Sequence, residues 1–111
     1  MNLASHVKDR LVDVEKNRQL LVDQLALPAQ PLWLDQVHGI SVVNAATVSQ
    51  SVTADASYSN QKNTVCAVLT ADCLPVLICN RQGTKVAAAH AGWRGVLAGV
   101  IEEAIHAMQA P

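Results

Sequence analysis

Three side chains that commonly bind transition metals stand at the ends of predicted strands: His38, Cys73 and His90. Imidazole nitrogen and thiolate sulfur suit Zn²⁺, and three protein ligands with one open position are typical of catalytic zinc sites. The three residues are separated by 35 and 17 positions, which matches no compact zinc motif. The residues alone therefore leave two interpretations open, a metal site or a buried cysteine beside two hydrogen-bonded histidines.

Charged and aromatic residues beside these candidates extend the possible chemistry. Asp72 could act as a general base or as a hydrogen-bond partner for a histidine, whereas its ordinary role would be to cap a turn. Arg94 follows Gly92 at a predicted turn from strand to helix, where a bidentate guanidinium and backbone N–H groups could bind phosphate or carboxylate. An ion pair between Arg94 and an acid such as Asp72 explains the arginine equally well. Trp93 is expected in the core.

The composition argues against two classes of partner, nucleic acids and membranes. The chain has 111 residues, 50% of them hydrophobic, with a formal net charge of -1, which predicts one globular unit. Eight Lys and Arg are mixed with nine Asp and Glu, and no apolar run reaches the ~18 residues of a membrane span. We therefore expect no nucleic-acid partner and no membrane. Three cysteines without a signal sequence predict reduced thiols and a cytoplasmic location, with Cys66 as a core thiol.

The hydrophobic pattern predicts an α/β or α+β fold, with mixed sheet layers flanked by helices. Residues 13–26 predict an amphipathic helix capped by Asp13, and residues 95–109 predict a second helix packed on the sheet. Strands are expected at residues 32–34 and 40–43. Three apolar runs, at residues 65–69, 74–79 and 86–89, predict strands buried on both faces. The polar stretch 46–63 predicts a loop or an edge.

Several blocks resemble the signature of one family, the YfiH-like proteins, also called the laccase domain or polyphenol oxidase family and described as purine nucleoside phosphorylases. The blocks are QVHG at residues 36–39, TADCLPVL at 70–77 and AAHAGWRG at 88–95, with NR at 17–18 and TADA at 53–56 as milder matches. The resemblance covers residues 1–111 and implies a YfiH-like fold. Members of the family are longer at both ends. We therefore expect one segment, the central portion of a longer domain, with an incomplete fold.

The same resemblance implies a function and its residues. Family positions matching His38, Cys73 and His90 bind zinc, so Zn²⁺, or else copper, is the expected cofactor. The implied activity is phosphorolysis of adenosine, inosine and methylthioadenosine, with a purine nucleoside and phosphate as small-molecule partners, together with deamination of adenosine. Cys73, Arg94 and Asp72 are then the expected catalytic residues, with Arg94 and the helix that follows it holding phosphate.

Three other functions remain open. Copper-dependent phenol oxidation has been attributed to the family, but it normally needs several copper ions and more histidines than the four present. A metal-free hydrolase that edits peptidoglycan precursors would use Cys73 as the nucleophile and His38 or His90 as the base. Alternatively, the chain is an inactive fragment that folds only by association, pairing with its own copy through unpaired sheet edges.

Overall fold

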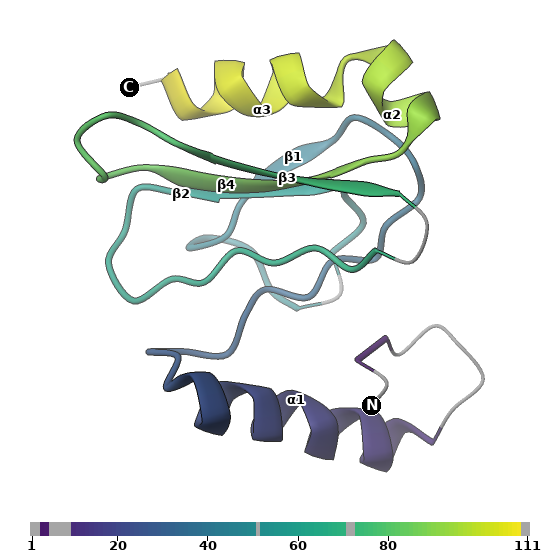
Figure 1. Cartoon of the computed structure of the whole chain (residues 1–111), viewed down its shortest axis with the longest axis vertical. Helices are drawn as coiled ribbons and strands as arrows, with labels where there is room; N and C mark the ends of the chain where they lie inside the picture. The colour runs from purple at the N-terminus through teal and green to yellow at the C-terminus, as the bar shows by residue number, and fades with distance from the viewer. Residues whose placement is uncertain (1–2, 5–9, 51, 71–72, 110–111) are drawn as a thin grey trace.

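A single mixed sheet forms the centre of the computed structural model, which describes residues 3–4, 10–50, 52–70 and 73–109. The strands lie in the order β1-β2-β4-β3, with β1 parallel to β2 and with β4 antiparallel to both of its neighbours. One face of the sheet is covered by α3, irregular segments lie on the other face, and α1 lies beyond them (Figure 1). The predicted mixed α/β architecture is confirmed. Within the described ranges the elements are α1 (Leu11–Leu25), β1 (Val42–Asn44), β2 (Ala56–Ser59), β3 (Leu74–Cys79), β4 (Val86–Ala91), α2 (Trp93–Ala98) and α3 (Val100–Gln109).

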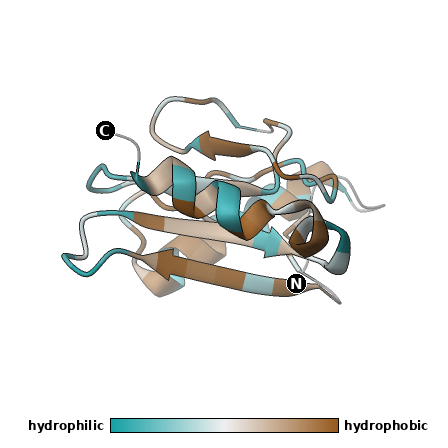
Figure 2. Cartoon of the chain, turned by 90° about the horizontal axis from the view of Figure 1, so that it is seen from above, coloured by the Kyte–Doolittle hydropathy of each residue, from teal (hydrophilic) through white to brown (hydrophobic). Residues whose placement is uncertain are grey.

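Small side chains allow α3 to pack closely against the sheet. Ala89 and Ala91 of β4 pack against Val100 and Ala104 of α3 in a buried contact. Lys85 donates a hydrogen bond to the last turn of α3, at Met108 O. Glu102 and Glu103 lie exposed on α3, and Figure 2, which looks onto this helix, shows hydrophilic residues along its outer side. The predicted packing of this amphipathic helix on the sheet is therefore confirmed. The buried residues of this cluster are Ala56, Ala89, Ala91, Val100 and Ala104.

The opposite face of the sheet is covered by extended segments instead of the strands expected at residues 32–34 and 65–69. Those two segments meet at one isolated bridge, between Leu32 and Cys66. Side-chain amides replace the missing ladder: Gln36 exchanges two hydrogen bonds with the main chain of Leu69, at 2.8 Å each. Gln50 accepts from Trp33 N–H at 2.9 Å. Both strand predictions were wrong because apolar periodicity does not reveal where side chains take over backbone hydrogen bonds.

The sheet itself differs from the prediction in two strands. The polar stretch at residues 46–63, for which a loop or an edge was predicted, contains an interior strand, β2. Its polar residues Ser57 and Ser59 are buried, because the strand lies between two others. Conversely, β3 has the predicted bounds, but it lies at the edge of the sheet and is not buried on both faces. Leu77 of β3 is 80% exposed. The prediction for β4 was closer, since the strand extends only two residues beyond the predicted end.

Both predicted helices begin two residues earlier than expected, at Leu11 and at Trp93, and the second ends at Gln109 as predicted. The first begins after Arg10, and Asp13 lies in its first turn and forms an ion pair with Arg10 at 3.7 Å in place of the expected cap. The second is divided into α2 and α3 by Gly99, whose φ of 102° interrupts the helical backbone. Within the described ranges, no helix combines the length and the hydropathy that crossing a bilayer requires.

Candidate metal centre

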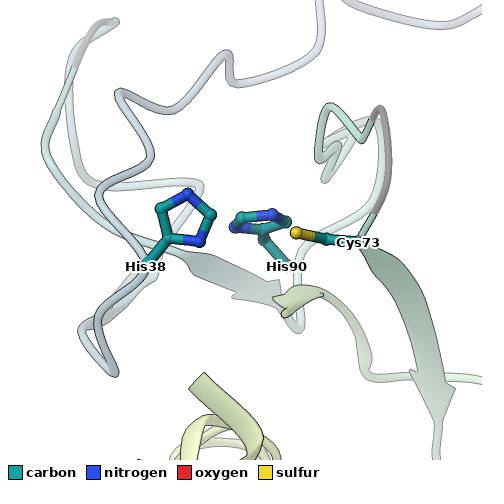
Figure 3. A group of neighbouring side chains, drawn as sticks. All are labelled: His38, Cys73 and His90. Atoms are coloured by element: carbon teal, nitrogen blue, oxygen red, sulfur yellow. The ribbon is translucent and has the colours of Figure 1, made fainter. Parts of the chain in front are cut away.

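The three candidate ligands come from different parts of the fold and converge. His38 lies in the turn before β1, Cys73 lies directly before β3, and His90 is in β4. One donor atom from each residue lies within 4.8 Å of the others. Figure 3 shows the three side chains turned toward one another, with the His90 ring between the His38 ring and the Cys73 thiol. Residues that are 35 and 17 positions apart in sequence are therefore neighbours in space.

His90 is the buried member of this group, with 5% of its surface exposed. Its Nδ1 lies 2.8 Å from Asp55 Oδ2, and its main-chain N–H donates to the Asp55 carbonyl at 2.7 Å. When Nδ1 carries the ring hydrogen and donates a hydrogen bond to the carboxylate, Nε2 has the free lone pair. His90 can therefore offer Nε2 to a metal ion.

His38 is exposed and is held by its main chain. Its φ of 61° lies in the left-handed region, which a residue with a side chain rarely adopts without support. That support comes from Asp55, whose carboxylate accepts the N–H groups of Val37, His38 and Gly39 at 2.9 to 3.0 Å. The ring centroids of His38 and His90 are 4.9 Å apart. The expected turn at Gly39 is present, but His38 itself adopts the unusual conformation.

Asp55 is fully buried and carries four hydrogen bonds on its carboxylate. Burial alone would raise the pKa of this acid, but hydrogen bonds from His90 and from the three backbone N–H groups outweigh it, so the pKa is lowered. Asp55 is therefore an anion at neutral pH. It supplies the negative charge and the acceptor atoms around which the two histidine segments are arranged.

Gly92 leaves room for the three donors. The turn between β4 and α2 brings its backbone against the group, and an added Cβ would lie 2.9 Å from Cys73 Sγ and 3.4 Å from His38 Nδ1. A contact of 2.9 Å is shorter than real side-chain packing allows, so any larger residue would displace the thiol. The thiol and the His38 ring can lie this close to the backbone because residue 92 has no side chain.

The donor set fits a zinc ion in its chemistry. Two imidazole nitrogens and one thiolate sulfur are ligands that Zn²⁺ accepts, and a fourth position would remain for water or substrate. Tetrahedral bonds of ~2.1 Å to nitrogen and ~2.3 Å to sulfur place donors roughly 3.5 Å apart. The observed span of up to 4.8 Å therefore requires the side chains to close in by about 1 Å, which rotamer adjustment of exposed His38 allows.

The other two thiols lie outside this group. Cys79 is exposed at the far end of β3, and Cys66 lies at the bridge to Leu32. Burial raises the pKa of the Cys66 thiol. None of the three cysteines forms a disulfide within the described ranges.

The other residues predicted near the site are Arg94, Trp93 and Asp72, and the structure describes the first two. Arg94 is exposed at the start of α2, where its guanidinium lies 5.2 Å from the centroid of the Trp93 ring. Trp93 is 70% exposed, so its predicted place in the core was wrong. The helix after Gly92 has only six residues, a weaker anion site than the long helix that was expected. Asp72 lies outside the residues that the structure describes.

Asp55 and Gly92 are functional candidates that motif reasoning did not single out. Asp55 stands in the TADA block, and its position opposite His90 depends on β2, a strand that the polar composition concealed. Gly92 was noted as part of a turn, but its proximity to Cys73 could be found only from the packing. The hydrogen-bond partner considered for a histidine was Asp72, whereas the observed partner is Asp55.

Sequence comparison connects the chain with bacterial proteins of about twice its length. It is 57% identical over 106 residues to the purine nucleoside phosphorylase YfiH of Escherichia coli, covering 95% of this chain and 44% of that protein. It is 50% identical over 111 residues to a purine nucleoside phosphorylase of Pseudomonas aeruginosa, covering 100% and 45%. The chain thus spans less than half of the length of these curated relatives.

Solved structures show the same fold. A protein of Neisseria meningitidis superposes with a TM-score of 0.90 at 49% identity, over 99% of this chain and 45% of that one. YlmD from Geobacillus stearothermophilus superposes with a TM-score of 0.79 at 29% identity, over 89% and 41%. The family model described as multi-copper polyphenol oxidoreductase laccase matches residues 1–111. The chain therefore belongs to this laccase-domain family, as its three sequence blocks predicted.

Proposed function

We propose that the chain carries the metal centre of a zinc-dependent purine nucleoside phosphorylase, with His38, Cys73 and His90 as the ligands. The observation that carries the proposal is the convergence of these three donors within 4.8 Å, two of them packed against the backbone of Gly92. The relatives named purine nucleoside phosphorylase give the reaction class. A bound zinc ion would supply a Lewis acid at the open coordination position.

The residues of the chain have distinct roles in this proposal. Cys73 contributes a thiolate, whose charge offsets part of the charge of the cation. Arg94 binds inorganic phosphate through paired hydrogen bonds, because its guanidinium is exposed at the start of α2. In phosphorolysis a phosphate oxygen forms a bond to ribose C1′, and the purine leaves with the electrons of the C1′–N9 bond and gains a proton. Asp72, next to Cys73 in sequence, is the proposed proton carrier.

We assign adenosine, inosine and methylthioadenosine as substrates, with deamination of adenosine as a second reaction. In deamination a water molecule adds to purine C6, and ammonia leaves with the proton that it gains from the water. Both reactions require a small nucleoside, and both are proposed for a location in the cytoplasm.

The family description supports a second candidate, copper-dependent phenol oxidation. Two histidines and a cysteine are also a ligand set for copper. Among the described residues one group of three donors is present, whereas multi-copper oxidation needs several ions. A third candidate, the metal-free hydrolase, would use Cys73 as the nucleophile and a histidine of the same group as the base. The identity and stoichiometry of the bound metal distinguish the three.

The test combines metal analysis with a product assay on one preparation. We expect one zinc per chain, and adenosine with phosphate should give adenine and ribose 1-phosphate, with inosine as the product of deamination. His38→Ala should lose the metal and both reactions, whereas His106→Ala, at an exposed histidine on α3, should retain them. Phosphorolysis by metal-free protein would contradict the proposal, and bound copper with phenol oxidation would favour the second candidate.

A further inference from the structure

One buried carboxylate connects the two histidines of the metal centre. We infer that Asp55 is a positioning residue that determines which nitrogen of His90 faces the metal and holds the His38 turn in place. The inference rests on the metal site proposed above, although part of its test needs no metal. Asp55 has no exposed surface, so it acts through the histidines and not on a substrate.

Three backbone N–H donors and the ring of His90 surround the Asp55 carboxylate. Oδ1 accepts from Val37 N–H at 3.0 Å and from Gly39 N–H at 2.9 Å. Oδ2 accepts from His38 N–H at 2.9 Å and lies 2.8 Å from His90 Nδ1. Three backbone N–H groups already donate to the two carboxylate oxygens, so this carboxylate acts as the acceptor of its surroundings, and its contact with His90 is a hydrogen bond when the ring hydrogen is on Nδ1. The other ring nitrogen, Nε2, is left free to bind a metal.

Asp55 is itself fixed by the main chain on both sides. Its N–H donates to Ser41 O at 3.1 Å, next to β1, and its carbonyl accepts from His90 N–H at 2.7 Å in β4. Three segments of the fold are thus joined at this residue. Such outer partners of histidine ligands typically contribute a factor of roughly 10 to 100 in metal affinity.

Replacement by asparagine separates this role from simple packing, because the amide has the same shape and one acceptor fewer. If the NH₂ group takes the place of Oδ1, it meets the N–H groups of Val37 and Gly39, and the His38 turn loses two hydrogen bonds. If the NH₂ group takes the place of Oδ2, two donors face each other at His38 N–H, and that hydrogen bond is lost. His90 Nδ1 must then accept a hydrogen bond from the NH₂ group. The His90 proton then moves to Nε2, which blocks that nitrogen as a ligand.

The experiment measures the tautomer and the zinc affinity separately. Nitrogen-15 spectra of the metal-free chain should show His90 protonated at Nδ1, and His90→Gln would identify its signals. Zinc titration should show roughly 10- to 100-fold weaker binding in Asp55→Asn than in the wild type. Asp35→Asn, the same change at an exposed aspartate of the neighbouring segment, should bind zinc like the wild type.

The outcomes that overturn the inference are distinct from those that overturn the proposed function. A wild-type His90 protonated at Nε2 would overturn the inference even if Asp55→Asn fails to fold. So would a folded Asp55→Asn that binds zinc as tightly as Asp35→Asn does. Failure of the wild type to bind zinc would instead overturn the proposed metal site, and the tautomer measurement would still decide the effect of Asp55 on His90.

Discussion

Asp55 and His90 are joined twice, once through their side chains and once through the main chain. The carboxylate Oδ2 lies 2.8 Å from Nδ1, and the His90 N–H donates to the Asp55 carbonyl at 2.7 Å. β2 and β4 pair in antiparallel register with Ala56 opposite Ala89, so Asp55 and His90 form the next step of the same ladder. The orientation of the buried imidazole is therefore determined by strand pairing.

Gly92→Ala should weaken zinc binding without unfolding the chain. The added methyl would lie 2.9 Å from Cys73 Sγ and would push the thiol away from the histidines. We expect an affinity loss of roughly 10-fold or more, comparable to the loss of an outer partner. The measurement is zinc titration with a competing chelator. Gly83→Ala, in the turn between β3 and β4, controls for general destabilisation: its φ of 69° makes alanine strained there, but no atom lies near the added Cβ and the metal centre is not touched. Unchanged affinity in Gly92→Ala would contradict the prediction.

Cys73→Ser should abolish zinc retention, because an alcohol is a far poorer zinc ligand than a thiolate. Cys79→Ser should retain the metal, since Cys79 is exposed at the other end of β3. Metal content of the purified variants, determined by mass spectrometry, checks both expectations. Equal loss in the two variants would indicate a different cluster of ligands.

Arg94→Lys should impair phosphorolysis more than deamination, because only phosphorolysis uses inorganic phosphate. Lysine keeps the charge but cannot form the paired hydrogen bonds of a guanidinium. We expect the Michaelis constant for phosphate to rise about 10-fold or more, while adenosine deamination changes little. The assay requires protein that is active in both reactions. Equal losses in the two reactions would assign Arg94 a structural role.

The Cys66 thiol should react with alkylating reagents only at a higher pH than an ordinary thiol needs. Thiolates are the reactive form, and burial raises the pKa of Cys66 above its ordinary value of about 8.5. Partial burial also restricts access, so Cys66 should be alkylated more slowly than exposed Cys79. Mass spectrometry after timed alkylation across a pH series gives the rate at each thiol and the midpoint for Cys66. A Cys66 midpoint at or below about 8.5 would contradict the prediction.

The isolated chain should pair with its own copy through β3. This strand is hydrogen-bonded to β4 on one side, and its Leu74 and Leu77 are 63% and 80% exposed. Sedimentation velocity at micromolar concentration should show a reversible dimer, and Leu77→Lys should shift it toward monomer. Leu11→Lys, at an exposed leucine of α1, should not. A wild type that remains monomeric would contradict the prediction.

The parts of the fold that sequence patterns predicted are those with strong apolar periodicity. The helix over α3 and the strands β3 and β4 were found because their apolar residues recur or run together. β2 was missed because Ala56 and Ser57 have no such pattern, although both are fully buried. Its burial results from two neighbouring strands and not from its own composition.

Sequence patterns likewise identified part of the candidate site, namely the residues whose type and motif are distinctive. His38, Cys73 and His90 were identified by residue type and by their family blocks, and the fold brings them together. Asp55 could not be assigned to His90 without knowing that β2 lies beside β4. Candidate ligands can be identified from motifs, whereas the side chains that contact them can be identified only from the strand order.

The distance between the ligands along the chain determines when during folding the site can form. His38 and His90 approach each other only after β2 has entered the sheet between β1 and β4, which closes long loops. A zinc finger, by contrast, folds because its closely spaced ligands bind the ion. In this protein an ion would bind late, to a sheet that has already formed. It would slow unfolding and leave the folding rate nearly unchanged, so zinc would prolong the lifetime of the native chain instead of helping it to fold.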